Sequence, residues 1–148
     1  MVAAQHPFPP DPESRVPIAF EFDTEDHVVR LSASGVVTDA ELTDTVEAMY
    51  ADPRHRPGMH ELLDCLPVTR VGVTPRGVRA IAVLISDRLD RHRVGWRIAI
   101  VTRSATIFAL ARMYQLLRDD SPEQVQVFRD LEPAEAWIAS APRGVPAG

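Results

Sequence analysis

The N-terminal part of the chain changes from a strand-like to a helix-like pattern of apolar residues. Apolar and polar residues largely alternate over Ile18 to Phe22 and again over His27 to Val37, on either side of a short acidic turn. This period of two predicts a β-hairpin. Thr38-Asp39-Ala40-Glu41 has the form of a capping box, and apolar residues then recur at helical spacing. A first helix is therefore predicted to run to about Ala51.

The rest of the chain repeats this change between strand and helix patterns. Short apolar runs predict strands at His60 to Leu66, Val94 to Val101 and Val125 to Phe128. The segment Pro67 to Val73 lacks a clear period and is predicted to be irregular.

Three further helices are predicted from capping residues and apolar stripes. Thr74 can cap a helix that stops near Arg91, and Pro75 suits its first turn. Asp130 can cap a short final helix containing Trp137 and Ile138. Between these two, a helix that follows Thr102 to Ala105 is predicted to present a core face of Ile107, Leu110, Ala111, Tyr114 and Leu117.

The order of elements predicts one α/β domain. The predicted order is strand, strand, helix, strand, helix, strand, helix, strand, helix. This order indicates a mixed, mostly parallel sheet of about five strands, flanked by about four helices. Residues 1–15 and 142–148 are rich in proline or glycine and lack periodicity, so we expect flexible tails on a domain that covers residues 16–141.

Composition narrows the classes of function. The chain has a net charge of -5, which argues against a nucleic-acid partner, because such partners require a clustered basic surface. All 16 basic residues are arginine, which excludes Schiff-base chemistry on lysine. With a single cysteine, no leader-like pattern at residues 1–15 and no long apolar run, we expect a cytoplasmic protein without an integral membrane segment.

Three stretches of the chain have the form of known family motifs. They are Gly35-Val36-Val37-Thr38 with Glu41-Leu42, Ile98-Ala99-Ile100-Val101 with Ala109-Leu110-Ala111-Arg112-Met113-Tyr114, and Val127-Phe128-Arg129-Asp130 with Ala134 and Ala136-Trp137-Ile138. These stretches resemble the SpoIIAA-like family of bacterial proteins, which is of STAS and SEC14 type. The resemblance covers about residues 16 to 140, and it implies a SpoIIAA-like fold and a signalling or binding role.

The resemblance departs from the anti-sigma-factor antagonists at the site of their switch. Those proteins carry a phosphorylatable serine in an Asp-Ser-Ser-Gly-type motif at the start of the helix after the third strand. This chain has Asp64-Cys65-Leu66 and then a longer loop to Thr74. A phosphate on Thr74 would meet helix amides and the guanidinium groups of Arg70 and Arg76. The alternative is that Thr74 only caps the helix.

A candidate binding site follows from the expected sheet topology. Ligands of parallel α/β sheets bind beyond the carboxyl ends of the strands, where loops and helix N-termini converge. Two loops of this chain carry hydroxyl and guanidinium groups there, although capping hydroxyls and solvated arginines are also expected at such an edge. The candidate ligand- or phosphate-binding residues are Asp64, Thr69, Arg70, Thr74, Arg76, Thr102, Arg103 and Ser104.

Other reactive residues do not form a recognisable catalytic set. His55 and His60, with Asp52 and Glu61 beside them, lack the spacing of an ordinary zinc site, so we expect a solvated loop, no metal and no cofactor. Cys65 has no local base and is predicted to be a small core residue.

Three functions remain open from the sequence. The first is a non-enzymatic regulatory module that binds an unidentified protein partner, with a homodimer also open because the hairpin could leave an exposed edge strand. The second is an enzyme that uses Asp64 or a loop histidine. The third is a carrier or sensor of a small apolar or lipid-like ligand, which predicts a cavity on the order of several hundred Å³ beside Ile81, Ile85, Ile107, Leu110 and Tyr114.

Overall fold

The structure, a computed structural model, describes residues 16–89 and 95–142. The predicted tails lie outside these ranges, apart from Pro142. Within the described residues the chain forms seven strands and four helices. They are β2 (Ile18–Asp23), β3 (Val28–Ala33), β4 (Gly35–Thr38), α1 (Asp39–Ala51), β5 (His60–Asp64), β6 (Val68–Gly72), α2 (Pro75–Leu89), β7 (Trp96–Val101), α3 (Ala105–Leu117), β8 (Glu123–Phe128) and α4 (Leu131–Ala139).

The main sheet has five strands in the order β2-β3-β5-β7-β8. Strand β2 is antiparallel to β3, and the other three neighbouring pairs are parallel. This arrangement confirms the predicted mixed, mostly parallel sheet. The register places Leu31, Leu63, Ile100 and Val127 in one row across four strands, so one face of the sheet is apolar from β3 to β8.

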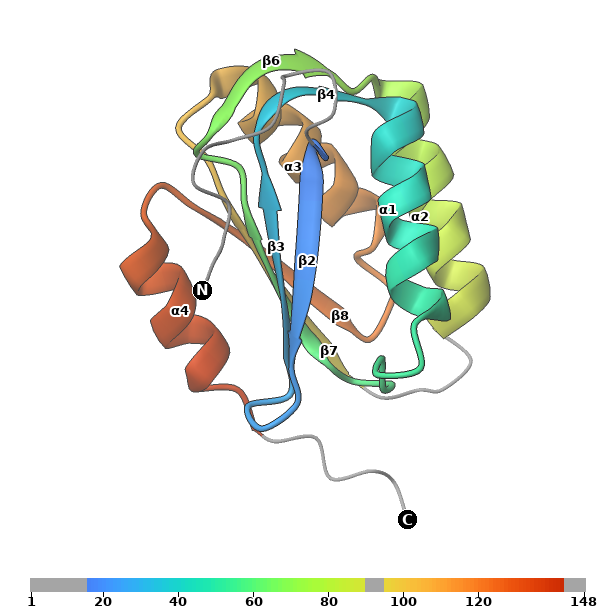
Figure 1. Cartoon of the computed structure of the whole chain (residues 1–148), viewed down its shortest axis with the longest axis vertical. Helices are drawn as coiled ribbons and strands as arrows, with labels where there is room; N and C mark the ends of the chain where they lie inside the picture. Colours follow the sequence, from blue (N-terminus) through green and yellow to red (C-terminus); the bar gives the residue numbers. More distant parts are fainter. Residues whose placement is uncertain (1–15, 90–94, 143–148) are drawn as a thin grey trace, which may run out of the picture.

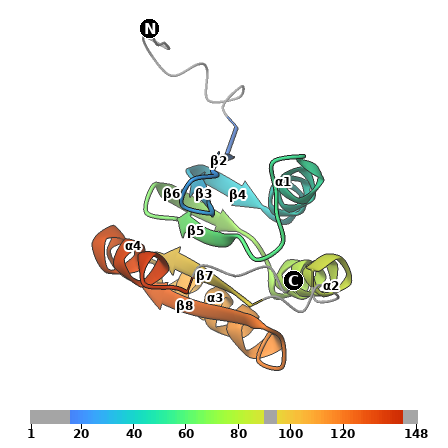
Figure 2. The ribbon, with the colours of Figure 1, turned by 90° about the horizontal axis from the view of Figure 1, so that it is seen from below.

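The helices divide unequally between the two faces of the sheet. From β3 to β8 the strands follow each other in chain order, so right-handed crossovers place α1, α2 and α3 on the same face. Helix α4 follows the last strand and covers the other face, as Figures 1 and 2 show. It contributes to a second, smaller core made by Val28, Leu62, Ala99, Val101, Ala134 and Ile138.

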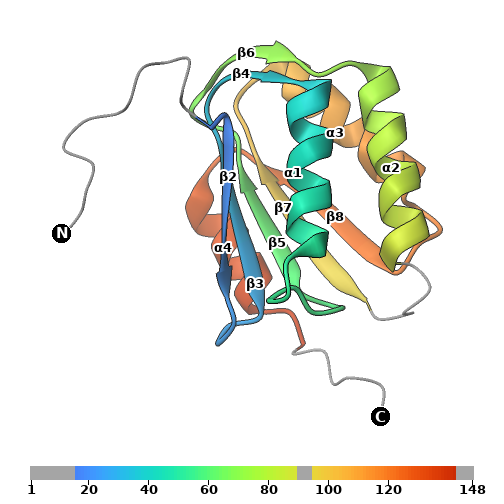
Figure 3. The same cartoon turned by 45° about the vertical axis from the view of Figure 1, so that its right-hand side comes forward.

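The predicted strand His27 to Val37 is wrong in one respect, because it is two strands. Strand β3 ends at Ala33, and Gly35 then adopts a φ of 65°, a left-handed conformation that glycine tolerates. Strand β4 leaves the main sheet and pairs in parallel with β6. The segment Pro67 to Val73, predicted to be irregular, therefore contains a strand. Figure 3 shows this β4–β6 pair at the same end of the molecule as the first turns of α1 and α2.

The predicted core face of α3 is correct except at its last position. Ala111 and Tyr114 are buried, but Leu117 is 45% exposed. The buried stripe continues four residues after Tyr114, at Arg118, which is only 4% exposed. A charged residue at the C-cap of α3 is therefore buried where the apolar pattern predicted that the preceding leucine would be.

The N-termini of α1 and α2 are capped by connected side chains. Thr38 and Glu41 form the predicted capping box at α1. Asp39, the first residue of α1, accepts hydrogen bonds from the backbone N–H and the hydroxyl of Thr74, at 2.8 and 2.5 Å. The Thr74 hydroxyl in turn accepts a bond of 3.1 Å from the N–H of Gly77. Thr74 is thus held as a helix cap by the neighbouring helix.

This capping arrangement predicts an unusual effect of Gly77→Ala. A methyl group on residue 77 would lie 1.9 Å from Oδ1 of Asp39 and would displace its carboxylate. We expect Gly77→Ala to lower the free energy of unfolding by about 1 kcal/mol, although glycine to alanine normally stabilises a helix. Urea unfolding measures the change. In an Asp39→Ala background the same substitution should be neutral or stabilising, and stabilisation in both backgrounds would refute the explanation.

Candidate functional site

An apolar cavity of about 160 Å³ lies between the main sheet and helices α1, α2 and α3. It is smaller than the several hundred Å³ expected from the sequence. A cavity of this volume is the size that accommodates a single aromatic ring. The five residues predicted to border it all do so, namely Ile81, Ile85, Ile107, Leu110 and Tyr114.

The two ends of the cavity differ in chemistry. Val37 of β4 and Val68 and Val71 of β6 line the end beyond the carboxyl ends of β3 and β5. Glu61, near the start of β5, and Tyr114, near the end of α3, line the opposite end. The β4–β6 pair therefore lines an apolar end, while Glu61 of the sheet and Tyr114 of α3 line the end that carries polar groups.

The hydroxyl groups in the cavity lining are already hydrogen bonded. Thr45 donates to the carbonyl oxygen of Glu41 at 2.7 Å. The Tyr114 hydroxyl lies 2.6 and 2.9 Å from the two carboxylate oxygens of Glu123 and donates to that group. Neither hydroxyl has a hydrogen left to offer to a ligand.

Glu61 is the carboxyl group of the lining, and it is only 7% exposed. The Tyr50 hydroxyl donates to its Oε2 at 3.2 Å. Within the described residues, Oε1 of Glu61 has no hydrogen-bond partner. Burial, reinforced by the nearby Glu123, raises the pKa of Glu61 from 4.5 to about 8, although the hydrogen bond from Tyr50 opposes this shift. Glu61 is therefore protonated near neutral pH.

Glu123 is buried in the same region and is bonded to Arg118 and Tyr114. Nε of Arg118 lies 2.7 Å from Oε1 of Glu123, and the two side chains are 4% and 0% exposed. Tyr114 bonds to the same carboxylate, and burial raises the pKa of Tyr114 well above its usual value. Removing one member of a buried ion pair typically costs about 3–5 kcal/mol, so this pair fixes the end of α3 against β8.

The residues predicted at the carboxyl edge of the sheet lie there, but mostly bond to their own surroundings. Oδ1 of Asp64 accepts from the N–H of Leu66 at 2.9 Å, and the Ser104 hydroxyl caps α3 by accepting from Ile107 at 3.2 Å. The buried Thr102 hydroxyl accepts from the N–H of Ser104 at 3.0 Å.

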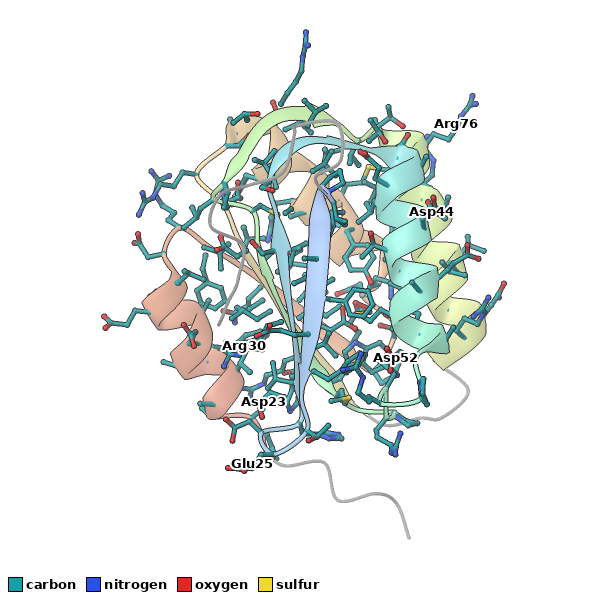
Figure 4. The ribbon with its side chains drawn as sticks, in the orientation of Figure 1. Asp23, Glu25, Arg30, Asp44, Asp52 and Arg76 are labelled. Carbon is teal, nitrogen blue, oxygen red and sulfur yellow. The ribbon has the colours of Figure 1, made fainter. Side chains whose placement is uncertain are left out.

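The arginines of this edge point in different directions. Arg103 forms an ion pair with Asp130, across to the loop after β8. Arg70 and Arg76 are exposed, as is Thr69 beside Arg70, and Figure 4 shows Arg76 projecting away from the molecule at the start of α2. Among the described residues, no hydrogen bond or ion pair joins Arg70 or Arg76 to the loop after β7. A shared anion site at this edge therefore stays a prediction.

The prediction of a solvated loop that contains both histidines is wrong for His60 and Glu61. His60 and Glu61 are buried in β5 and point to opposite faces of the sheet. Nδ1 of His60 accepts from the N–H of Arg97 at 3.0 Å, and burial lowers the pKa of His60. The described residues contain no group of three side chains suited to hold a metal ion.

The polar end of the cavity was missed from the sequence, although a signal for it existed. In a strand at His60 to Leu66, Glu61 shares a face with Leu63. In the same way Glu123 shares a face with Val125 and Val127. An acidic residue in phase with buried aliphatic residues indicates a buried carboxyl group.

The raised pKa of Glu61 predicts how folding stability changes with pH. The folded protein keeps a proton that the unfolded chain releases above about pH 4.5, so stability is lost as pH rises from that value to about 8. The slope is at most about 1.4 kcal/mol per pH unit, the value for one proton. Glu61→Gln should remove this slope in urea unfolding, whereas Glu21→Gln at an exposed position should retain it. An unchanged slope in Glu61→Gln would contradict the assignment.

Comparisons with known proteins identify the fold. The chain is similar to a solved protein of the DUF3478 family from Shewanella loihica, described as uncharacterised and as having a SpoIIAA-like fold. The two share 17% sequence identity with a TM-score of 0.52, over 82% of this chain and 91% of the other. No family model matches the sequence. No curated protein matches it either.

The likeness agrees with the topology described above. No helix in residues 16–89 or 95–142 is long and apolar enough to cross a lipid bilayer. The chain is a mixed, mostly parallel α/β domain, and its fold is SpoIIAA-like, as its sequence motifs indicated.

Proposed function

We propose that this domain binds a small, largely apolar ligand in the cavity between its main sheet and helices α1, α2 and α3. The observation that carries the proposal is an apolar cavity of about 160 Å³ with one carboxyl group in its lining. Pockets for small molecules are mainly apolar, with a few placed polar groups. The cavity has this character, and its volume suits a ligand with one aromatic ring.

The energetics of packing support an occupant. Protein interiors are normally filled to the density of organic crystals. The side chains around a space of about 160 Å³ lack packing contacts on the side that faces it. An apolar ligand would restore the lost contacts, and side chains such as Ile81, Ile98 and Ile107 are already arranged around the space.

A regulatory role with a protein partner is compatible with ligand binding and stays a prediction. Control by phosphorylation of Thr74 faces a local obstacle, because the Thr74 hydroxyl is held by Asp39. A phosphate there would have to displace a carboxylate of the same charge sign. The enzymatic alternative gains no support from Asp64, whose carboxylate bonds to a loop amide.

Binding of toluene, a one-ring apolar probe, tests the proposal. We expect a dissociation constant on the order of 0.1–1 mM, from the usual binding free energy per atom of small ligands. Methyl NMR titration should show saturable shifts at Ile81, Ile98 and Ile107 around the cavity. Ile138 lies in the core on the opposite face and should not respond.

A pair of substitutions on α3 controls for indirect effects. Ala111 is buried and lines the cavity, whereas Ala109 is exposed on the same helix. Ala111→Leu should fill the space and abolish toluene binding, while Ala109→Leu should leave it intact. Absence of saturable shifts in the unmodified protein, or equal binding by both variants, would rule out the cavity as the site.

A further inference from the structure

We infer that Glu61 and Tyr50 form a head-group site at the polar end of the cavity, which selects ligands that carry a neutral hydrogen-bond acceptor on an apolar body. A ketone, ester or ether oxygen is such an acceptor. The inference rests on the proposed function and specifies its ligand class. It starts from Glu61, which lines the cavity and whose Oε1 has no hydrogen-bond partner among the described residues.

Glu61 is the lining residue whose hydroxyl hydrogen can be donated to a ligand, because the other hydroxyl groups of the lining already donate within the protein. The hydroxyl hydrogens of Thr45 and Tyr114 are given to Glu41 and Glu123, respectively. Tyr50 donates to Oε2 of Glu61. The proton of a neutral Glu61 then resides on Oε1 and is the hydroxyl hydrogen available to a molecule in the cavity.

The position of the Tyr50 hydroxyl is set by packing. The ring of His55 lies 4.9 Å from the ring of Tyr50, with an angle of 75° between their planes. Burial and the neighbouring Glu61 raise the pKa of Tyr50, so its hydroxyl keeps its proton and continues to donate. The orientation of the Glu61 carboxyl group is therefore held from the side of α1.

The surroundings of Glu61 act on its ionisation in opposite directions: burial and the Glu123 carboxylate disfavour it, and the hydrogen bond from Tyr50 favours it. Tyr50 comes from α1, Tyr114 from α3 and Arg118 from the C-cap of α3, while β8 contributes Glu123. Arg118 bonds directly to Glu123, and that carboxylate raises the pKa of Glu61. Helix α2 and strand β7 present aliphatic residues to the cavity, including Ile85 and Ile98.

This environment distinguishes between polar head groups. An anionic ligand would be placed in an apolar cavity close to the Glu123 carboxylate, which is unfavourable. A cationic amine would require Glu61 to ionise while buried, and the pair would lose the hydration of both charges. A neutral acceptor requires neither change and pairs with the hydrogen on Oε1.

Two probes of nearly equal shape test the inference. Acetophenone carries a carbonyl oxygen, and α-methylstyrene replaces that oxygen with a methylene group. At about pH 6, Glu61→Leu should weaken acetophenone binding about 3- to 10-fold, the value of one hydrogen bond, and should not weaken α-methylstyrene binding. Glu61→Gln should retain acetophenone, because its amide N–H can donate in place of the carboxyl group. Methyl NMR titration gives each dissociation constant.

The unmodified protein provides a second measurement that does not depend on the folding of a variant. Acetophenone should bind progressively more weakly as pH rises through about 8, because Glu61 then loses the donated proton. In Glu61→Gln the dissociation constant should not change over the same range. A flat profile in the unmodified protein would overturn the inference.

The outcomes separate the two proposals. If neither probe binds the unmodified protein, the proposed function fails, and the head-group site fails with it. If both probes bind and Glu61→Leu weakens them equally or weakens neither, cavity binding stands and the head-group site is refuted. Tighter binding of benzylamine than of acetophenone at about pH 6 would also refute it, in favour of a cationic head group.

Discussion

Two carboxyl groups, those of Glu61 and Glu123, are buried in the same interface between a sheet and its helices. Buried carboxylates close to one another repel, and each loses hydration, so one of them retains its proton. Glu123 is bonded to Arg118 and Tyr114, whereas within residues 16–89 and 95–142 Glu61 is bonded only to the hydroxyl of Tyr50. These bonds connect β5 and β8 to the C-terminal ends of α1 and α3. The spacing of the helices from the sheet at this end therefore depends on a polar cluster, and the cavity lies beside it.

Topology explains why the cavity has one polar and one apolar end. Successive right-handed crossovers bring α1, α2 and α3 to one face, so the polar cluster gathers residues from the starts of strands and the ends of helices. At the other end the chain turns away from the main sheet at Gly35, and β4 pairs with β6. Valine side chains of this small sheet then line the cavity. Figure 1 shows the β4–β6 pair and the connection after α1 at opposite ends of the main sheet.

Parallel α/β proteins often bind ligands at the carboxyl edge of the sheet. In this domain, several polar side chains at that edge form hydrogen bonds or ion pairs with other residues of the protein. Thr74 bonds to Asp39 and ties α2 to α1, and Arg103 pairs with Asp130 and ties the loop after β7 to the start of α4. These contacts stabilise the positions of loops above the sheet. The carboxyl oxygen on which the proposed head-group site rests, Oε1 of Glu61, lies instead inside the domain and has no partner among the described residues.

The sequence by itself determined the features that depend on neighbouring residues. Periodicity and capping predicted the order of the main strands and helices, the capping box at Thr38 and the burial of Cys65. Tertiary structure decided whatever depends on residues distant in the chain. The pairing of β4 with β6 joins segments separated by a helix and a strand. The protonation of Glu61 depends first on its burial by other elements and then on Glu123, which belongs to a different strand. Local sequence patterns do not predict such contacts, because the energies of strand pairing and of charge interactions depend on distance in space and not on separation along the chain.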